Sequence, residues 1–297
     1  MLKSRTTKRL LLAASLSLLT LSASHAADIE AVQQLAEAGD SKAQALLGYF
    51  YYSGEGVSQD YQQAVQWYRR AAEQGNRDAQ YNLGVAYALG EGIDQDLSAA
   101  ANWYRRAAEQ NHAAAAFSLG LAYLYGEGVS QDPQVAANWF QRSGDLGYAP
   151  AQLHLGSLYH TGEGVEQDHS QAASWYEKAA EQGDAMAQYN LGNLYRSGRG
   201  VTKDNAIARR WFKAAAEQEN PLAIAELETL SPPAATASVT PALSADASSQ
   251  ATATDADVTS PPSTEAEMTA AEAEPLAASP VPADAESETE IESRSTA

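Results

Sequence analysis

Beyond the first 26 residues, four histidines are the side chains best suited to hold a metal or to transfer a proton near neutral pH: His112, His154, His160 and His169. His154 and His160 are six residues apart, which places them on different faces of a helix. No pair has the spacing of zinc ligands. The chain contains no cysteine, so thiolate ligands, disulfides and a cysteine nucleophile are excluded. No Gly-x-Ser-x-Gly elbow is present either. We therefore expect no catalytic residue, no metal site, no cofactor and no enzymatic activity.

Two repeated motifs could also suggest a ligand-binding or catalytic site. Gly54-Glu55-Gly56-Val57 resembles a phosphate-binding loop, but it lacks the Gly-Lys-Ser/Thr ending and carries an acid. It recurs in four copies, with Gly198-Arg199-Gly200 as the fifth, so we interpret it as a structural turn. The carboxylates that recur after it are better placed as helix N-caps than as general bases, and they are Asp60, Asp96, Asp132, Asp168 and Asp204.

These motifs belong to a repeat of 36 residues that continues for five copies without an insertion. Tryptophan recurs at positions 67, 103, 139, 175 and 211, glycine at 48, 84, 120, 156 and 192, and tyrosine at 51, 87, 123, 159 and 195. A fixed period of this length is typical of solenoid proteins, in which each unit buries its apolar face only by stacking on its neighbours.

Each copy predicts two helices joined by a glycine turn. In the first copy, Gln44, Leu47, Gly48 and Tyr51 share one helix face. The glycine turn stops that helix, and Asp60 then caps a second helix, with Gln63 at the capping-box position. The second helix carries Trp and an adjacent Tyr or Phe, which we expect to supply the main packing of each copy.

The full pattern resembles the Sel-one-like repeat (SLR), a relative of the tetratricopeptide repeat: Ala43, Gln44, Leu47, Gly48, Tyr51, Gly54, Gly56, Val57, Asp60, Ala64, Trp67, Tyr68, Ala71, Ala72 and Gly75. This resemblance implies an all-α fold, a right-handed α-solenoid of antiparallel helix pairs. It also implies adaptor or scaffold roles in protein complexes. Departures from the pattern are local, and they are Asn111, Ala116, Ser143, Gly144 and Glu219.

Both ends differ in composition from the repeats. The first 26 residues combine a basic start, an apolar run and the small residues Ser24 to Ala26, which predicts a cleaved secretory signal. The last 67 residues carry twelve acids and one arginine but no aromatic residue, which predicts a disordered acidic tail. The predicted segments are a signal peptide (1–26), an N-terminal capping helix (27–39), five repeats (40–75, 76–111, 112–147, 148–183 and 184–219), a C-terminal capping helix (220–230) and the tail (231–297).

Export directs the chain to the periplasm of a Gram-negative cell or to the extracellular space. The net charge of -19 disfavours nucleic acid and anionic lipid surfaces as partners. We expect no membrane insertion after signal cleavage, and a monomer or a weak oligomer.

By analogy with tetratricopeptide solenoids, the variable positions of the first helices should line a concave groove. The candidate partner-binding residues are Tyr49, Tyr52, Tyr81, Val85, Phe117, Leu121, Leu124, His160, Tyr189, Asn193 and Arg196. The alternative for each of them is packing against the adjacent repeat. The expected partner is another protein or a peptide segment. The alternative function is envelope binding of a peptidoglycan fragment or another small molecule.

Overall fold

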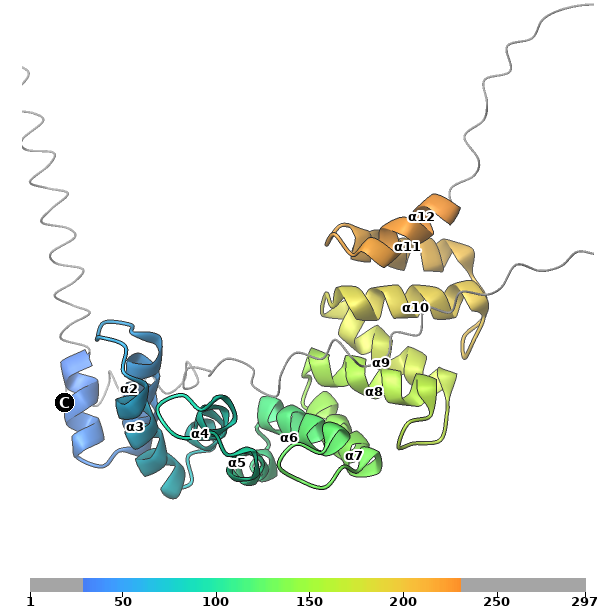
Figure 1. The fold of residues 1–297 in the computed structure, drawn as a ribbon. Helices are drawn as coiled ribbons and strands as arrows, with labels where there is room; N and C mark the ends of the chain where they lie inside the picture. Colours follow the sequence, from blue (N-terminus) through green and yellow to red (C-terminus); the bar gives the residue numbers. More distant parts are fainter. Residues whose placement is uncertain (1–28, 231–297) are drawn as a thin grey trace, which may run out of the picture.

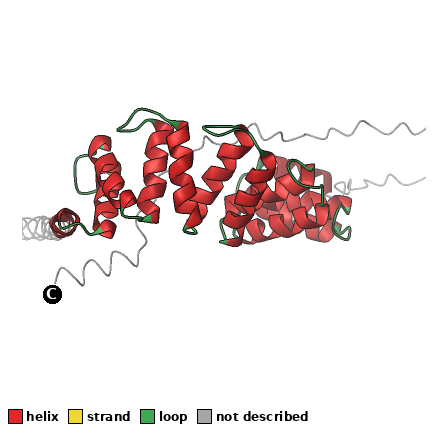
Figure 2. Ribbon diagram, turned by 90° about the horizontal axis from the view of Figure 1, so that it is seen from below, coloured by secondary structure: helices red, strands yellow, loops and turns green. Residues whose placement is uncertain are grey.

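The structure is a computed structural model that describes residues 29–230. The predicted signal peptide and the predicted tail lie outside the described residues. Within them the chain forms helices joined by short loops, and no strand occurs (Figure 2). None of these helices is long and apolar enough to cross a membrane.

Residues 29–37 form a single helix at the start of the described chain. The helices that follow are α2 (Ser41–Ser53), α3 (Tyr61–Glu73), α4 (Arg77–Leu89), α5 (Leu97–Glu109), α6 (Ala113–Tyr125), α7 (Pro133–Asp145), α8 (Ala149–Thr161), α9 (His169–Glu181), α10 (Ala185–Ser197), α11 (Asn205–Ala216) and α12 (Pro221–Leu230). Each helix packs mainly against the helix before it and the helix after it, and the pairs follow a curved path (Figure 1). The fold is therefore an all-α solenoid.

The first helix of each repeat ends at a glycine turn, and the second helix begins after an aspartate, as the repeat pattern predicts. Gly54 has φ 77° and closes α2 with a hydrogen bond to the Phe50 carbonyl. The Asp60 carboxylate then accepts the Gln63 backbone N–H at 3.0 Å. The Asp60 N–H, which a capping-box glutamine would bind, instead donates to the carbonyl of Tyr51 at 2.8 Å. This last bond recurs at all five aspartates and ties each turn to the helix that precedes it.

The core is built from an aromatic ring of each second helix set against a glycine of its first helix. Gly120 faces Phe140, which is fully buried, and an added Cβ on Gly120 would lie 2.6 Å from Cδ1 of the ring. The same pairing recurs four more times, as Gly48 with Tyr68, Gly84 with Tyr104, Gly156 with Tyr176 and Gly192 with Phe212. Only glycine permits an approach this close, so the repeated glycines set the spacing of each pair.

The tryptophans lie farther out than these rings. Trp67 and Trp175 are buried, whereas Trp103, Trp139 and Trp211 are half-buried. Four of them carry a cation over the ring: Arg70 over Trp67, Arg106 over Trp103, Arg142 over Trp139 and Lys178 over Trp175. These four tryptophans thus contribute apolar burial on one side and a cation–π contact near the surface.

Candidate partner-binding surface

Four of the predicted groove residues are buried rather than open to a partner. Tyr81 and Val85 are 0% exposed, and Leu121 and Leu124 are 5% and 3% exposed. The prediction that these four line an open groove is wrong. A first helix inside the array contacts second helices on both sides, as α4 contacts α3 and α5, so it has little free face. Tyr81 accordingly packs 5.8 Å from the Tyr104 ring and stacks on His112 of the next repeat.

The predicted residues of the first repeat remain half-buried. The Tyr52 hydroxyl donates to Oε2 of Glu91 at 2.7 Å, and its ring lies 5.1 Å from that of Tyr61. Burial, followed by the contact with the Glu91 carboxylate, raises the pKa of Tyr52 well above its ordinary value. Tyr49 and Tyr52 both pack against an apolar cluster that includes Val65 and Tyr68. Tyr52 therefore links the first repeat to the turn of the second.

Phe117, in the middle of the array, is also half-buried among rings. It lies 5.5 Å from Phe140, 5.4 Å from Tyr148 and 5.1 Å from His154. The ring of His154 also lies 5.4 Å from Phe140. Burial disfavours the charged imidazole and lowers the pKa of His154, although the contact with the Pro150 carbonyl opposes this effect. Phe117 and His154 are thus mainly part of the packing between repeats.

The predicted groove residues of the last two repeats are only partly free. Arg196 donates to Oε2 of Glu226 on α12 at 2.7 Å, so its charge is largely neutralised. His160 lies 4.9 Å from His169, ring centre to ring centre. Tyr189 lies 5.9 Å from Phe212, and Asn193 is half-buried. Binding by the half-buried predicted residues stays a prediction.

Two exposed apolar side chains on the first helices were not among the predicted residues. Leu89 ends α4 and is 40% exposed, and Tyr125 ends α6 and is 38% exposed. They occupy equivalent positions 36 residues apart, where the other three copies carry Ser53, Thr161 and Ser197. A comparison of the copies at this position would have found them, because large apolar residues occur there in two adjacent repeats only.

A row of carboxylates runs beside these two side chains. From the second repeat onward, each glycine turn folds over the start of the preceding second helix, because a Cβ on Gly92 would collide with the Tyr61 carbonyl and one on Gly128 with that of Leu97. Glu91, Glu127 and Glu163 precede the second glycine of these turns. We call Leu89, Tyr125 and these three glutamates the acidic turn edge.

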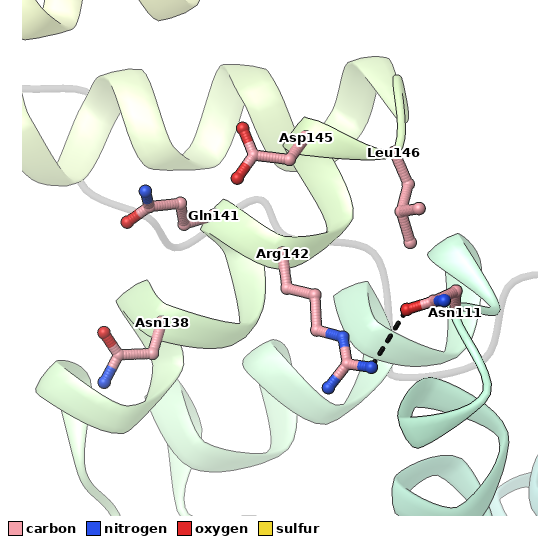
Figure 3. A pocket seen from close by; sticks show the side chains of 6 residues that line it. All are labelled: Asn111, Asn138, Gln141, Arg142, Asp145 and Leu146. Carbon is pink, nitrogen blue, oxygen red and sulfur yellow. Dashed lines mark hydrogen bonds between the residues drawn. The ribbon is translucent and has the colours of Figure 1, made fainter.

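A separate hollow borders α7 and the turns that follow α5 and α7 (Figure 3). It has a volume of about 400 Å³ and is lined by Asn111, Asn138, Gln141, Arg142, Asp145 and Leu146. Arg142 reaches across it and donates to Asn111 Oδ1 and to the Glu109 carbonyl, both at 3.0 Å. A second hollow of about 420 Å³ borders α3. Its lining includes Arg69, Arg70 and Glu73.

The hollow in Figure 3 lies where the repeat departs from its own pattern. In four repeats a glutamine of the second helix donates to a glutamine of the first, as Gln110 does to Gln80 at 2.8 Å. In the third repeat both are replaced, by Leu146 and Ala116, and Leu146 is 43% exposed. Asn111 replaces the closing glycine with φ 62°. The third repeat thus loses a structural hydrogen bond and gains an exposed apolar side chain.

Residues 29–230 contain no group of three or more His, Asp or Glu side chains that could hold a metal ion. The pair His160 and His169 has no third such ligand beside it.

Comparisons with known proteins agree on one family. The Sel1 repeat family model matches residues 41–76, 77–112, 113–148, 149–184 and 185–220. The chain is similar to a protective antigen present in uropathogenic Escherichia coli strains with an SLR fold, at 39% identity and a TM-score of 0.66. That match covers 68% of this chain and 43% of the other, so the chain spans less than half the length of that antigen.

A Sel1 repeat protein from Oxalobacter formigenes is 38% identical with a TM-score of 0.59, and the match covers 65% of this chain and 76% of the other. No curated protein matches the chain. The five matched repeats and the two related structures show that the chain belongs to the Sel1 repeat family.

Proposed function

We propose that this chain is an exported, non-enzymatic scaffold that binds a partner polypeptide along the free side of its first helices. Sel1 repeat proteins are generally protein-interaction scaffolds.

The observation that carries the proposal is the contrast between constant and variable positions in five copies of one scaffold. The glycines facing the aromatic rings, the left-handed turn glycines and the aspartate caps recur in every repeat. The exposed and half-buried residues near the ends of the first helices differ between repeats, and they include Tyr52, Leu89, Tyr125, His160 and Arg196. Positions that differ while the scaffold stays constant are the ones free to serve recognition.

Export is supported by the predicted signal at residues 1–26. The similarity to a protective antigen of uropathogenic E. coli favours the same interpretation. Cell fractionation tests this part directly. The proposal expects a product shortened by the signal in the envelope or periplasmic fraction, and a full-length product in the cytoplasm would contradict it.

Capture and reconstitution test the binding claim. Immobilised chain lacking residues 1–26 is incubated with an envelope extract, and each captured polypeptide is then purified and titrated against the chain. We expect at least one polypeptide to bind stoichiometrically with a Kd of about 10 µM or tighter, corresponding to about 7 kcal/mol. Failure of every captured polypeptide to bind in purified form would refute the scaffold function.

The hollow in Figure 3 favours a second candidate function, binding of a small polar ligand such as a peptidoglycan fragment. Its amides, one guanidinium and one carboxylate can hydrogen-bond a sugar or a short peptide, and Leu146 offers an apolar contact. Calorimetry with purified muropeptides separates the two candidates. Saturable binding that Arg142→Ala removes would support the small-ligand function, and the absence of heat would exclude it for this ligand class.

A further inference from the structure

We propose that the acidic turn edge is a docking surface for a cationic segment of a partner protein, with an apolar side chain of that segment seated on Leu89 and Tyr125. This inference rests on the scaffold function proposed above and adds the chemistry of the partner.

The apolar part of the edge is exposed and occurs in only two of the five repeats. Leu89 and Tyr125 are 40% and 38% exposed at a position where Ser53, Thr161 and Ser197 serve in the other repeats. A serine or threonine is therefore sufficient for the fold at this position. Tyrosine is among the residues that most often anchor protein interfaces. Two adjacent repeats thus present apolar side chains on one edge of the array, where a partner can cover them.

Carboxylates in the glycine turns follow the apolar pair along the chain. Glu91 and Glu127 follow Leu89 and Tyr125 by two residues in the turns. Each turn also adjoins the repeat before it: the Tyr52 hydroxyl donates to Glu91 of the next turn at 2.7 Å, and the Gly164 turn packs on Pro133 at the start of α7. Burial, followed by the charges of Glu163 and Glu127, raises the pKa of Tyr125. The turns that carry Glu127 and Glu163 therefore both adjoin the repeat of Tyr125.

The charge of this edge is not neutralised within the described chain. No Lys or Arg in residues 29–230 pairs with Glu91, Glu127 or Glu163. Glu91 accepts a hydrogen bond from the Tyr52 hydroxyl, a neutral donor. The fifth turn carries Arg199 in place of the glutamate, so the negative row is confined to the first four repeats.

The negative charge of the acidic turn edge indicates which kind of partner can bind there. Nucleic acid and anionic lipid are repelled by the row of carboxylates. The chain's own segment 231–297 is acidic as well, with twelve acids and one arginine, so it has the wrong sign for this edge. A segment that carries Lys or Arg beside a large apolar residue satisfies both parts of the surface.

Selection from a library of short random peptides tests the inference. The full chain lacking only the signal is the target, and selected peptides are titrated by fluorescence anisotropy at low and high salt. We expect the peptides to be rich in Lys or Arg with at least one large apolar residue. The double variant Leu89→Ser/Tyr125→Ser, which copies Ser53 and Ser197, should raise their Kd by at least about tenfold.

Matched control variants distinguish peptide binding at this edge from the non-specific attraction of cationic peptides to an acidic protein. Leu146→Ser/Ile224→Ser removes side chains that are each 43% exposed elsewhere, and it should leave the Kd within about twofold. Glu91→Gln/Glu127→Gln/Glu163→Gln should flatten the salt dependence, whereas neutralising the exposed acids that end α3, α5 and α9 should not. Circular dichroism verifies that every variant is folded.

The outcomes distinguish this inference from the proposed function. Selected peptides that are acidic or neutral, or that bind the Leu89→Ser/Tyr125→Ser variant unchanged, would overturn the cationic docking surface while leaving a scaffold function in place. If no peptide is selected and no captured polypeptide binds in purified form, both proposals fail.

Discussion

Substitution of Gly120 by alanine tests how tightly the helix pairs approach each other. An added Cβ would lie 2.6 Å from both Cδ1 and Cε1 of Phe140, against 3.4 Å or more in ordinary contacts. These atoms belong to a fully buried ring, which cannot swing away into solvent. Overpacking of this kind costs about 1–3 kcal/mol. Alanine gains about 1 kcal/mol of helix propensity over glycine.

Because the contact is far below the ordinary distance, we place the overpacking cost at the upper end and expect a net loss of about 2 kcal/mol. For an array of this size, that loss lowers the Tm by about 4–8 °C. Thermal unfolding followed by far-ultraviolet circular dichroism measures it. Asn138→Ala, on the exposed face of α7, is the control for a change to alanine and should alter stability by less than about 0.5 kcal/mol.

The double variant Gly120→Ala/Phe140→Leu tests the physical cause. Phe140→Leu alone should cost about 1.5 kcal/mol, but it also removes the ring that the new Cβ would strike. The double variant should therefore be more stable than the sum of the single effects predicts. A Gly120→Ala protein as stable as the wild type, or two costs that add, would refute the close approach.

Two further predictions concern the third repeat and the packing of the fourth repeat against it. Ala116→Gln/Leu146→Gln restores the glutamine pair that four repeats form at 2.7–3.0 Å, and it should stabilise the chain by about 0.5–1.5 kcal/mol in urea unfolding. A double variant no more stable than either single variant would contradict that role. The folded chain holds the pKa of His154 below its ordinary value of 6.5, so the unfolded chain takes up the proton first as the pH falls. The stability is thus fully present above about pH 6.5 and declines below it, and the loss of Tm between about pH 7.5 and pH 5 should be smaller in His154→Leu than in the wild type.

The sequence was sufficient to predict the repeat units and their local chemistry. The spacing of glycine and aspartate predicted helix ends that the structure confirms at Gly54 and Asp60. These features depend on residues close together in the chain, so a single copy contains the information. The capping box at Gln63 was wrong in part, because the backbone carbonyl of Tyr51 occupies the Asp60 N–H. Every residue has a backbone carbonyl, so the residue types do not indicate which carbonyl accepts this hydrogen bond.

The candidate site was predicted less well than the fold. The helical periodicity of α4 gave one packed face and one free face, but α3 and α5 contact that helix from two sides. Tyr81 and Val85 were therefore assigned to a groove and are instead in the core. Leu89 was missed although its position could be compared across the five copies. The two glutamines that pair in four repeats recur at a fixed spacing in the sequence. Both are replaced in the third repeat, by Ala116 and Leu146, and this joint replacement indicates that the two positions contact each other.

Photo-crosslinking at position 125 in the living source cell is the decisive test of partner binding at the acidic turn edge. A photoreactive phenylalanine replaces Tyr125 in one strain, and Ile224, which is 43% exposed on α12, in a control strain. The account predicts a light-dependent adduct with a distinct polypeptide from position 125 and none from position 224. Equal adducts from both positions, or no adduct from position 125, would contradict a partner-binding edge on the first helices.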